Sequence, residues 1–330
     1  MRCASSLSRI FRFGLAAAVA LTLASLSPQQ AAAQGYPNKP IRIIIPFGPG
    51  GFADITLRIV ADKLGERLGH RPIIDNRPSG GGIAAAQAVA TSPADGYTLI
   101  VLTNGTAITP SLFKSLPFDP VKDFVPISSV AFFDVHLLVN NASPIKTVAD
   151  LVAEAKKRPG ALNMGAINPG STQSLSAELF KATAGLEMTN VPFKTSPDVL
   201  TALLRDDIVV GFETYAALKG GIDGKQIRSI ASTGPTRSLP DVPTTAEAGL
   251  PSYEVYGWNS LFAPAGTPPE VVALLNKEIK EILALPDVQA KMKELGAEPK
   301  SSTPAEVAAR LAADIKKWAA VIELAKIEKR

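Results

Sequence analysis

The sequence predicts an α/β fold of two lobes, each a mostly parallel sheet flanked by helices. Three observations support this prediction. Short β-rich runs alternate with helical patterns along the chain, which is typical of βαβ units and parallel sheets. The alternation occurs in two successive series that meet near residue 135. The last sixty or so residues then read as helices that complete the first lobe, so the chain crosses between lobes twice, as a hinge requires.

The N-terminus is typical of an export signal. Three arginines and no acidic residue flank an apolar run of about fourteen residues, Phe13–Leu26, which is too short to span a bilayer comfortably. The run Ala31–Ala33 then supplies the small side chains that signal peptidase requires. We therefore expect residues 1–33 to be a signal peptide that is cleaved after Ala33. An uncleaved membrane anchor is the alternative.

Composition excludes several classes of function. The one cysteine, Cys3, lies in the predicted signal, so disulfides, thiolate catalysis and cysteine metal sites are excluded for the mature chain. Three of the 34 basic residues and none of the 30 acidic ones lie in the signal, which leaves a net charge of +1 on 297 residues. This small charge argues against nucleic acid or an anionic membrane surface as a partner. With no second long apolar run, we expect the mature chain not to insert into the membrane. We also expect it to be a monomer.

The first lobe is expected to comprise residues 34–134 and 252–330. In its first part, strands are predicted over Ile41–Pro46, Arg71–Asp75 and Thr98–Leu102, with helices over Ile55–Leu68 and Ile83–Thr91 between them.

In the later part of this lobe, Thr267–Glu270 and Thr303–Glu306 each match a capping box with proline at the first helical position. These boxes predict two amphipathic helices, one over Val271–Leu283 and one from Glu306 to roughly Lys326.

The second lobe is expected to comprise residues 135–251 and to repeat the same alternation. Its predicted strands are Val135–Val139, Leu162–Gly165, Ile208–Phe212 and Ile227–Ser232, and its predicted helices are Val148–Lys157 and Leu175–Ala184.

The glycine-rich run Pro46–Asp54 is the most informative stretch. It follows a strand and opens a helix, so it brings bare backbone and the positive end of a helix dipole to one place. This combination predicts a backbone site for a carboxylate or phosphate. One alternative is a tight turn in which Asp54 only caps the helix. Another is a dinucleotide fingerprint, Gly48-x-Gly50-x-x-Ala53, which is disfavoured by Pro49 and by the lack of nicotinamide cofactors outside the cell.

Two further strand-to-helix turns have a similar polar lining. The run Asn168–Ser174 could face the first turn across a cleft, and two such sites would suit a ligand with two polar ends. The alternative is ordinary helix capping by Ser171 or Thr172. The run Thr103–Thr106 is a third turn of this type, with the same alternative.

Little in the sequence supports catalysis or metal binding. His70 and His136 lie in different segments without neighbouring ligands, and no Gly-x-Ser-x-Gly elbow occurs. The run Ser79–Gly82 has no base nearby and reads as a flexible loop at the cleft edge. We therefore predict no catalytic residue, no metal ligand and no cofactor. For Trp258, contact with ligand and packing between the lobes remain equally open.

Six stretches together give the chain a family resemblance over nearly all of its mature length. They are Tyr36–Arg42, Pro46–Asp54, Asn76–Pro78, Asp95–Leu99, Leu239–Gly249 and Leu261–Pro268. With them the chain resembles the Bug-type extracytoplasmic receptors of tripartite tricarboxylate transporters. The resemblance implies a periplasmic binding protein of the Venus-flytrap type that is not an enzyme. Such a receptor closes on a small carboxylate and docks on a two-component membrane transporter. A ligand sensor for a signalling partner and an exported enzyme are the alternatives.

The resemblance also implies a set of ligand-binding residues. By position, these are Phe47, Gly50, Gly51 and Asp54 in the first turn, Asn104 and Thr106 in the third, and Gly170, Ser171 and Thr172 in the opposing one.

Two positions depart from the family pattern. Ser174 stands where histidine is common, and Glu213 stands where aspartate is usual and should face the ligand. We therefore expect a compact mono- or dicarboxylate with a hydrogen-bond donor to bind better than citrate. In the alternative, Glu213 points to solvent or pairs with a lysine.

Overall fold

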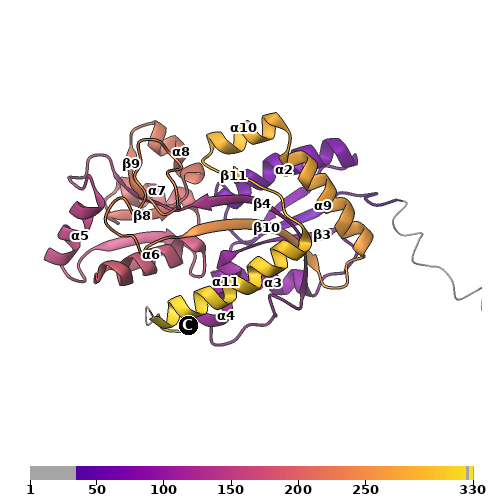
Figure 1. Cartoon of the computed structure of the whole chain (residues 1–330), viewed down its shortest axis with the longest axis horizontal. Helices are drawn as coiled ribbons and strands as arrows, with labels where there is room; N and C mark the ends of the chain where they lie inside the picture. The colour runs from indigo at the N-terminus through magenta and orange to yellow at the C-terminus, as the bar shows by residue number, and fades with distance from the viewer. Residues whose placement is uncertain (1–34, 325–326, 330) are drawn as a thin grey trace, which may run out of the picture. The chain divides into compact units, whose positions relative to one another are not determined.

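The computed structural model describes residues 35–324 and 327–329 (Figure 1). The features described below belong to the compact unit that begins at Lys39. The predicted signal peptide and the last residues of the predicted C-terminal helix lie outside the described residues. Within the described part of the chain, no helix is both long enough and apolar enough to cross a membrane.

The strands of residues 39–324 form two sheets, and the first has six strands in the order β11-β4-β10-β3-β1-β2. Strands β1, β2 and β3 are parallel, whereas β10 is antiparallel to β3 and to β4, and β11 is antiparallel to β4. Their bounds are β1 Arg42–Ile45, β2 Ile73–Asn76, β3 Thr98–Thr103, β4 Phe124–Asp134, β10 Tyr256–Pro264 and β11 Glu298–Pro299.

Helices pack on both faces of this first sheet. Helices α2 and α9 lie together, and on the other side α11 runs beside α4 (Figure 1). The helical elements are α2 Phe52–Leu68, the 3₁₀ turn η1 Gly80–Gly82, α3 Ile83–Ala90, α4 Asn104–Leu112, α9 Pro269–Leu283, α10 Pro286–Glu294 and α11 Pro304–Leu324.

The second sheet has five strands in the order β7-β6-β8-β5-β9. Strands β6, β7 and β8 are parallel, and β5 lies antiparallel between β8 and β9. The bounds are β5 His136–Asn140, β6 Asn163–Ile167, β7 Thr189–Phe193, β8 Val210–Glu213 and β9 Ile227–Ser232, with helices α5 Val148–Lys157, α6 Thr172–Ala184, α7 Ser196–Leu204 and α8 Tyr215–Asp223.

The α/β class with two helix-flanked sheets is as predicted, but the pairing of the strands is mixed. The parallel strands β1, β2, β3, β6 and β8 are those expected from the βαβ patterns, and the reversed orientation of β5, β10 and β11 was not anticipated. Strands β4 and β10 escaped prediction because almost every residue of both is buried, so their sequences lack the alternation of a half-buried strand. Strand β7 and helices α7, α8 and α10 were also missed.

One of the two predicted capping boxes forms. The Thr303 hydroxyl accepts from the Glu306 N–H at 3.2 Å, and the Glu306 carboxylate accepts from the Thr303 N–H at 2.7 Å. The capping box predicted at Thr267 does not form. Helix α9 has Pro268 as its N-cap, and the Thr267 hydroxyl instead donates to the Pro264 carbonyl at 2.8 Å.

Thr233 joins the two crossings between the sheets. The chain leaves the first sheet through Val135, between β4 and β5, and returns through residues 233–255, between β9 and β10. The Thr233 hydroxyl accepts from the Val135 N–H at 2.9 Å and donates to the Val255 carbonyl at 2.6 Å. Its backbone bonds the same two residues. The sheets therefore change where the lobe boundary near residue 135 was predicted, and the full division into lobes stays a prediction.

Candidate functional site

The three predicted turns meet around one small cavity between the two sheets. Its volume is about 20 Å³, which is room for about one water molecule. Both sheets and their connecting turns contribute to it, as expected at the carboxyl ends of parallel strands. The wall consists of Phe47, Gly51, Phe52, Ala53, Thr103, Phe133, Ile167, Thr172, Gln173 and Asn259.

The start of helix α2 forms one wall of the cavity without any side-chain cap. Its N-cap is Gly51, and Gly51 to Ala53 all line the cavity. The first N–H groups of a helix have no partner within the helix and carry the positive end of its dipole. This wall therefore presents backbone donors to an anion.

The Asp54 side chain stabilises the turn and does not line the cavity. Its carboxylate accepts from the Gly50 N–H at 3.0 Å and from Nε of Arg58 at 3.0 Å. Gly50 has a left-handed backbone, with φ of 77°, so the turn suits glycine there. The alternative in which Asp54 caps the helix is wrong, since α2 has no side-chain cap.

The start of helix α6, on the opposite side, is capped. The Ser171 hydroxyl accepts from the Ser174 N–H at 3.0 Å and donates to the Ile167 carbonyl at 2.8 Å. The capping alternative for Ser171 is therefore confirmed. Thr172 has a different role, because its hydroxyl donates to Oδ1 of Asn104 at 2.5 Å. This bond joins the second turn to the third across the cavity.

A second contact between the two sides comes from the glycines. The Gly81 N–H donates to the Pro169 carbonyl at 2.6 Å, so Ser79–Gly82 lies against the opposing turn as an ordered 3₁₀ turn. A Cβ on Gly170 would lie 2.8 Å from Cα of Gly81, which shows how closely the two backbones approach.

Two buried amides at the cavity have no acceptor for their NH₂ groups. Nδ2 of Asn104 and Nδ2 of Asn259 make no hydrogen bond to the described residues, and both side chains are at most 1% exposed. Asn259 pairs across β10 and β3 with Thr103, the residue that precedes Asn104. An unsatisfied buried donor costs about 1–3 kcal/mol. The pair therefore points to an acceptor that the protein itself does not supply.

The third turn caps its own helix. Thr103 and Thr106 form a capping box at the start of α4, so the Thr106 hydroxyl is engaged with the Thr103 N–H at 3.3 Å. The capping alternative for this turn is confirmed, and only Asn104 keeps a free polar group there.

Glu213 lies behind the cavity wall, in contact with Gln173. Its carboxylate is fully buried and accepts from Nε2 of Gln173 and from the Ser196 hydroxyl, both at 2.7 Å. The Thr214 N–H is a third donor, at 2.7 Å. Burial raises the pKa of Glu213, against the effect of these donors. The structure thus corrects the prediction that Glu213 itself faces the cavity, and the alternative of solvent or a lysine is wrong.

Of the eleven predicted site residues, three lie on the cavity wall: Phe47, Gly51 and Thr172. The other eight stand around it: Gly50, Asp54, Asn104, Thr106, Gly170, Ser171, Ser174 and Glu213. Sequence reasoning missed Gln173, Phe133 and Asn259. The last two belong to the unpredicted strands β4 and β10, while Gln173 follows Thr172 at the start of α6 and was within reach of the helix-start argument.

The remaining candidates lie elsewhere. Nε1 of Trp258 donates to Asp314 at 2.7 Å, so this side chain packs between β10 and α11 and does not line the cavity. His136 is buried at the start of β5, next to the crossing at Val135. Among the described residues, no group of three or more His, Cys, Asp or Glu could hold a metal ion.

Comparison with known proteins identifies the family. The profile of the tripartite tricarboxylate transporter family receptor matches residues 56–327. The chain is similar to the structure of Rpa4515 from R. palustris with adipate, at 36% identity and a TM-score of 0.86, covering 89% of this chain and 100% of that one. It is also similar to MatC from Rhodopseudomonas palustris with bound malate, at 29% identity and a TM-score of 0.82, covering 87% and 100%.

A third similar structure is that of the periplasmic binding protein BugD, at 27% identity and a TM-score of 0.85, covering 89% of this chain and 100% of that one. These likenesses confirm the two-lobed binding-protein fold and the Bug-type resemblance. They also confirm that the relatives are receptors and not enzymes. The chain therefore belongs to the family of receptors of tripartite tricarboxylate transporters.

Proposed function

We propose that this protein captures a small carboxylate between its two lobes and delivers it to a two-component membrane transporter. The observation that carries the proposal is the pair of unpaired buried amides, Asn104 and Asn259, beside the uncapped start of α2. Amide N–H donors and a helix N-terminus are matched by a carboxylate and not by a cation or an apolar group. Two similar proteins hold adipate and malate, which agrees with this chemistry.

Binding requires the lobes to separate first. A cavity of about 20 Å³ is far too small for a dicarboxylate, since small-molecule sites are usually about 300–1,000 Å³. The bonds from Thr172 to Asn104 and from Gly81 to Pro169 must open to admit a ligand. We assign the hinge to Thr233, where both crossings meet. A ligand that contacts both lobes then stabilises the closed form through its differential contacts.

Gln173 is the residue that we assign to ligand selection. Its Nε2 is held by Glu213, which leaves Oε1 as the acceptor at the cavity wall. An acceptor with a buried acid behind it favours a ligand hydroxyl or amine there over a second carboxylate. The proposed ligand is therefore a compact mono- or dicarboxylate with a donor group, held by Phe47, Gly51, Asn104, Thr172, Gln173 and Asn259.

The receptor is proposed to act in the periplasm after removal of residues 1–33. The arginine-flanked apolar run and the alanines before residue 34 support an export signal. BugD, a similar protein, is a periplasmic binding protein. Intact-mass measurement of a periplasmic extract checks the expected start at Gln34, and a full-length species held in the membrane would contradict it.

Calorimetry with a set of carboxylates tests the proposed binding. Adipate, malate, succinate and citrate are titrated into the purified protein, and into the Asn259→Leu variant. At least one of the first three should bind, and the variant should bind it several-fold more weakly, because one donor is lost. Asn276→Leu is the matched control, since the Asn276 amide is fully engaged by the Ile127 and Ser302 carbonyls away from the cavity. If none of the four carboxylates binds, the proposal fails.

Delivery to a transporter needs its own test. Uptake of the bound carboxylate by cells with and without this receptor, in the presence of its two membrane components, should depend on the receptor. Uptake that is equal in both strains would favour a sensor over a transport receptor.

A further inference from the structure

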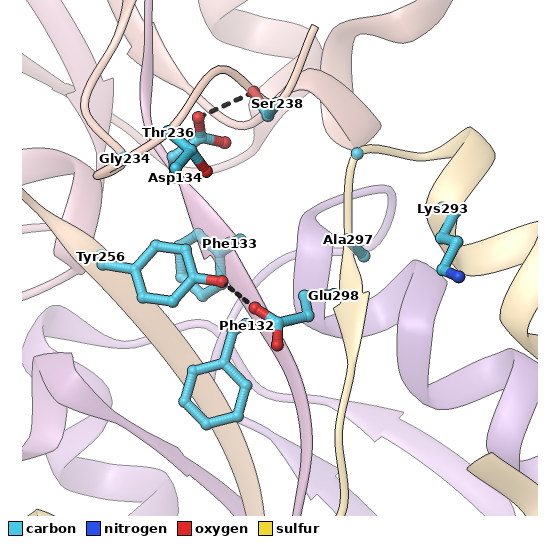
Figure 2. Close-up of a pocket in the computed structure, with 11 residues that line it drawn as sticks. Phe132, Phe133, Asp134, Gly234, Thr236, Ser238, Tyr256, Lys293, Ala297 and Glu298 are labelled. Carbon is cyan, nitrogen blue, oxygen red and sulfur yellow. Dashed lines mark hydrogen bonds between the residues drawn. The ribbon is translucent and has the colours of Figure 1, made fainter. Parts of the chain in front are cut away.

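A second cavity, of about 290 Å³, lies beside the hinge (Figure 2). The end of β4 forms its floor, and the return crossing, the start of β10 and the segment from α10 to β11 form its walls. Phe133 contributes to this cavity and also to the small cavity between the lobes. We call it the hinge cavity. Its polar side chains are those of Asp134, Thr236, Ser238, Tyr256, Lys293 and Glu298.

Strand order places the hinge cavity behind the hinge, away from the ligand turns. In the first sheet, β1 and β3 carry the turns on one side of β10 and β4, and β11 with Glu298 lies on the other side. In the second sheet, β6 and β8 lie on one side of β5, and β9 lies on the other, followed by Gly234–Ser238. A rotation about the hinge that opens the front must therefore bring these rear segments together and narrow the hinge cavity.

Strand register places four side chains on the same face of the first sheet. Tyr256 pairs with Asp134, and Glu298 pairs with Phe132 two residues away along β4. Because side chains alternate between faces, all four point to one side. The rings of Phe132 and Tyr256 stack at 5.9 Å, and the Tyr256 hydroxyl donates to Glu298. Figure 2 shows the two carboxylates with the Tyr256 ring between them.

Asp134 is the buried acid of the cavity, and its side-chain partners are Ser238, His136 and Ser232. It is only 4% exposed, and one oxygen accepts from the Ser238 hydroxyl at 2.8 Å. Its other oxygen lies 3.5 Å from Nε2 of His136, which is longer than a good hydrogen bond. Burial acts to raise the pKa of Asp134, but the interactions with His136 and Ser238 outweigh it and lower the pKa overall. The floor of the cavity therefore carries a negative charge.

Among the described residues, no lysine or arginine forms an ion pair with Asp134, whose one such partner is His136. Lys293 also lines the cavity, and it forms no ion pair with Asp134 or Glu298. Lys300 and Arg310 lie over the Phe132 ring, 5.8 and 4.6 Å from its centroid, and Nζ of Lys300 lies 3.9 Å from Glu298. These two side chains therefore lie at the Glu298 end of the cavity. The described residues also offer no group of three metal-ligating side chains here. A charged oxygen beside aromatic rings, without a metal-ligand set, suits an organic ammonium group.

We propose that the hinge cavity binds a small primary amine with an apolar body, its ammonium group on Asp134 and its body against Tyr256. Because the cavity is wide only when the lobes are together at the front, the bound amine favours the closed receptor. By linkage, an amine that favours closure must raise the affinity for the carboxylate, and the carboxylate must raise the affinity for the amine by the same factor.

The probe for this site is 2-phenylethylamine, with the neutral 2-phenylethanol as its matched control. Calorimetry should give a Kd of about 1 mM or tighter for the amine and no measurable binding for the alcohol. Asp134→Asn should weaken amine binding about tenfold or more. Glu298→Gln, on an exposed side chain that cannot threaten the fold, should weaken it about twofold to threefold. Equal binding of amine and alcohol, or full amine binding by both variants, would overturn the site.

Coupling is measured by titrating adipate with and without saturating amine. We expect the adipate Kd to fall about fivefold, the low end of typical coupling between sites. An unchanged or raised adipate Kd would overturn the coupling. Gly51→Val separates the two cavities, since it should spare amine binding; loss of amine binding in this variant would place the amine at the front and overturn the proposal. If adipate does not bind at all, the function proposed above fails, while the amine titrations still decide the hinge site.

Discussion

The starts of helices α2 and α6 face the same cavity but present different chemistry. Both follow a parallel strand and a glycine turn, and sequence reasoning treated them as two versions of one anion site. At α2 no side chain caps the helix, and its first residues, Gly51 to Ala53, line the cavity with their N–H groups uncapped. At α6 the Ser171 hydroxyl caps the helix, and the cavity meets the side chains of Thr172 and Gln173 instead.

This difference predicts that the two helix starts contribute differently to ligand recognition. A bare helix start binds any carboxylate of suitable size, because its donors belong to the backbone and carry no further information. A capped start with two polar side chains can distinguish one ligand from another, since each side chain offers a fixed donor or acceptor. We therefore expect changes at α2 to alter affinity for all ligands and changes at α6 to alter their ranking.

The largest expected effect is at α2. Gly51→Val places a branched side chain on the cavity wall, and we expect at least tenfold weaker binding of every carboxylate in calorimetry. The backbone tolerates the change, because a Cβ there would lie 3.5 Å from the Ser196 hydroxyl, an ordinary contact. Circular dichroism should therefore be unchanged. Gly220→Val is the control, since its Cβ would meet nothing within 4 Å. Wild-type affinity in Gly51→Val would move the site elsewhere.

A smaller and selective effect is expected at α6. Gln173→Leu removes the acceptor Oε1 but keeps the volume, so malate should bind about fivefold more weakly while succinate, which lacks the hydroxyl, should change less than twofold. The expected loss corresponds to about 1 kcal/mol, as for one hydrogen bond. An equal loss for both ligands would mean that Gln173 acts on affinity and not on ranking, and the division between the two helix starts would fail.

Closure should also be visible, as a modest change in size. Two lobes joined at Thr233 rotate about the hinge, so the radius of gyration in solution scattering should fall when saturating carboxylate is added. Thr233→Val removes the hydroxyl that bonds both crossings and leaves two buried backbone groups without it. That variant should be less stable by about 1–3 kcal/mol in urea unfolding. Identical scattering profiles with and without ligand would argue against a clamp.

The sequence predicted the class of fold and the places of the turns, because parallel strands and helix starts leave local patterns. Helix α5 and strand β9 have the predicted bounds, and the cavity lies where the glycine-rich turns were expected. The sequence did not predict which polar atoms at the cavity remain without a hydrogen-bond partner. The partner of Glu213 on the cavity wall, Gln173, lies 40 residues away in the sequence, and the partner of Thr172, Asn104, lies 68 residues away. Such partners leave no local pattern.

The smallest expected effect is a pH dependence of the unfolding free energy, which comes from Glu213 on the α6 side of the cavity. Burial raises the pKa of Glu213, so the folded protein holds this proton more strongly than the unfolded chain does. Stability from this group is therefore lost as pH rises from the unfolded pKa, about 4.3, through the raised folded pKa.

Wild-type stability alone cannot reveal this loss. The carboxyls whose pKa values are lowered, such as those of Asp119 and Asp150, stabilise the fold increasingly as pH rises through the acidic range. Glu213→Gln shares those groups. The difference in unfolding free energy, wild type minus variant, should fall as pH rises from 4 towards 7. A constant or rising difference would mean that Gln173, Ser196 and Thr214 keep Glu213 ionised throughout.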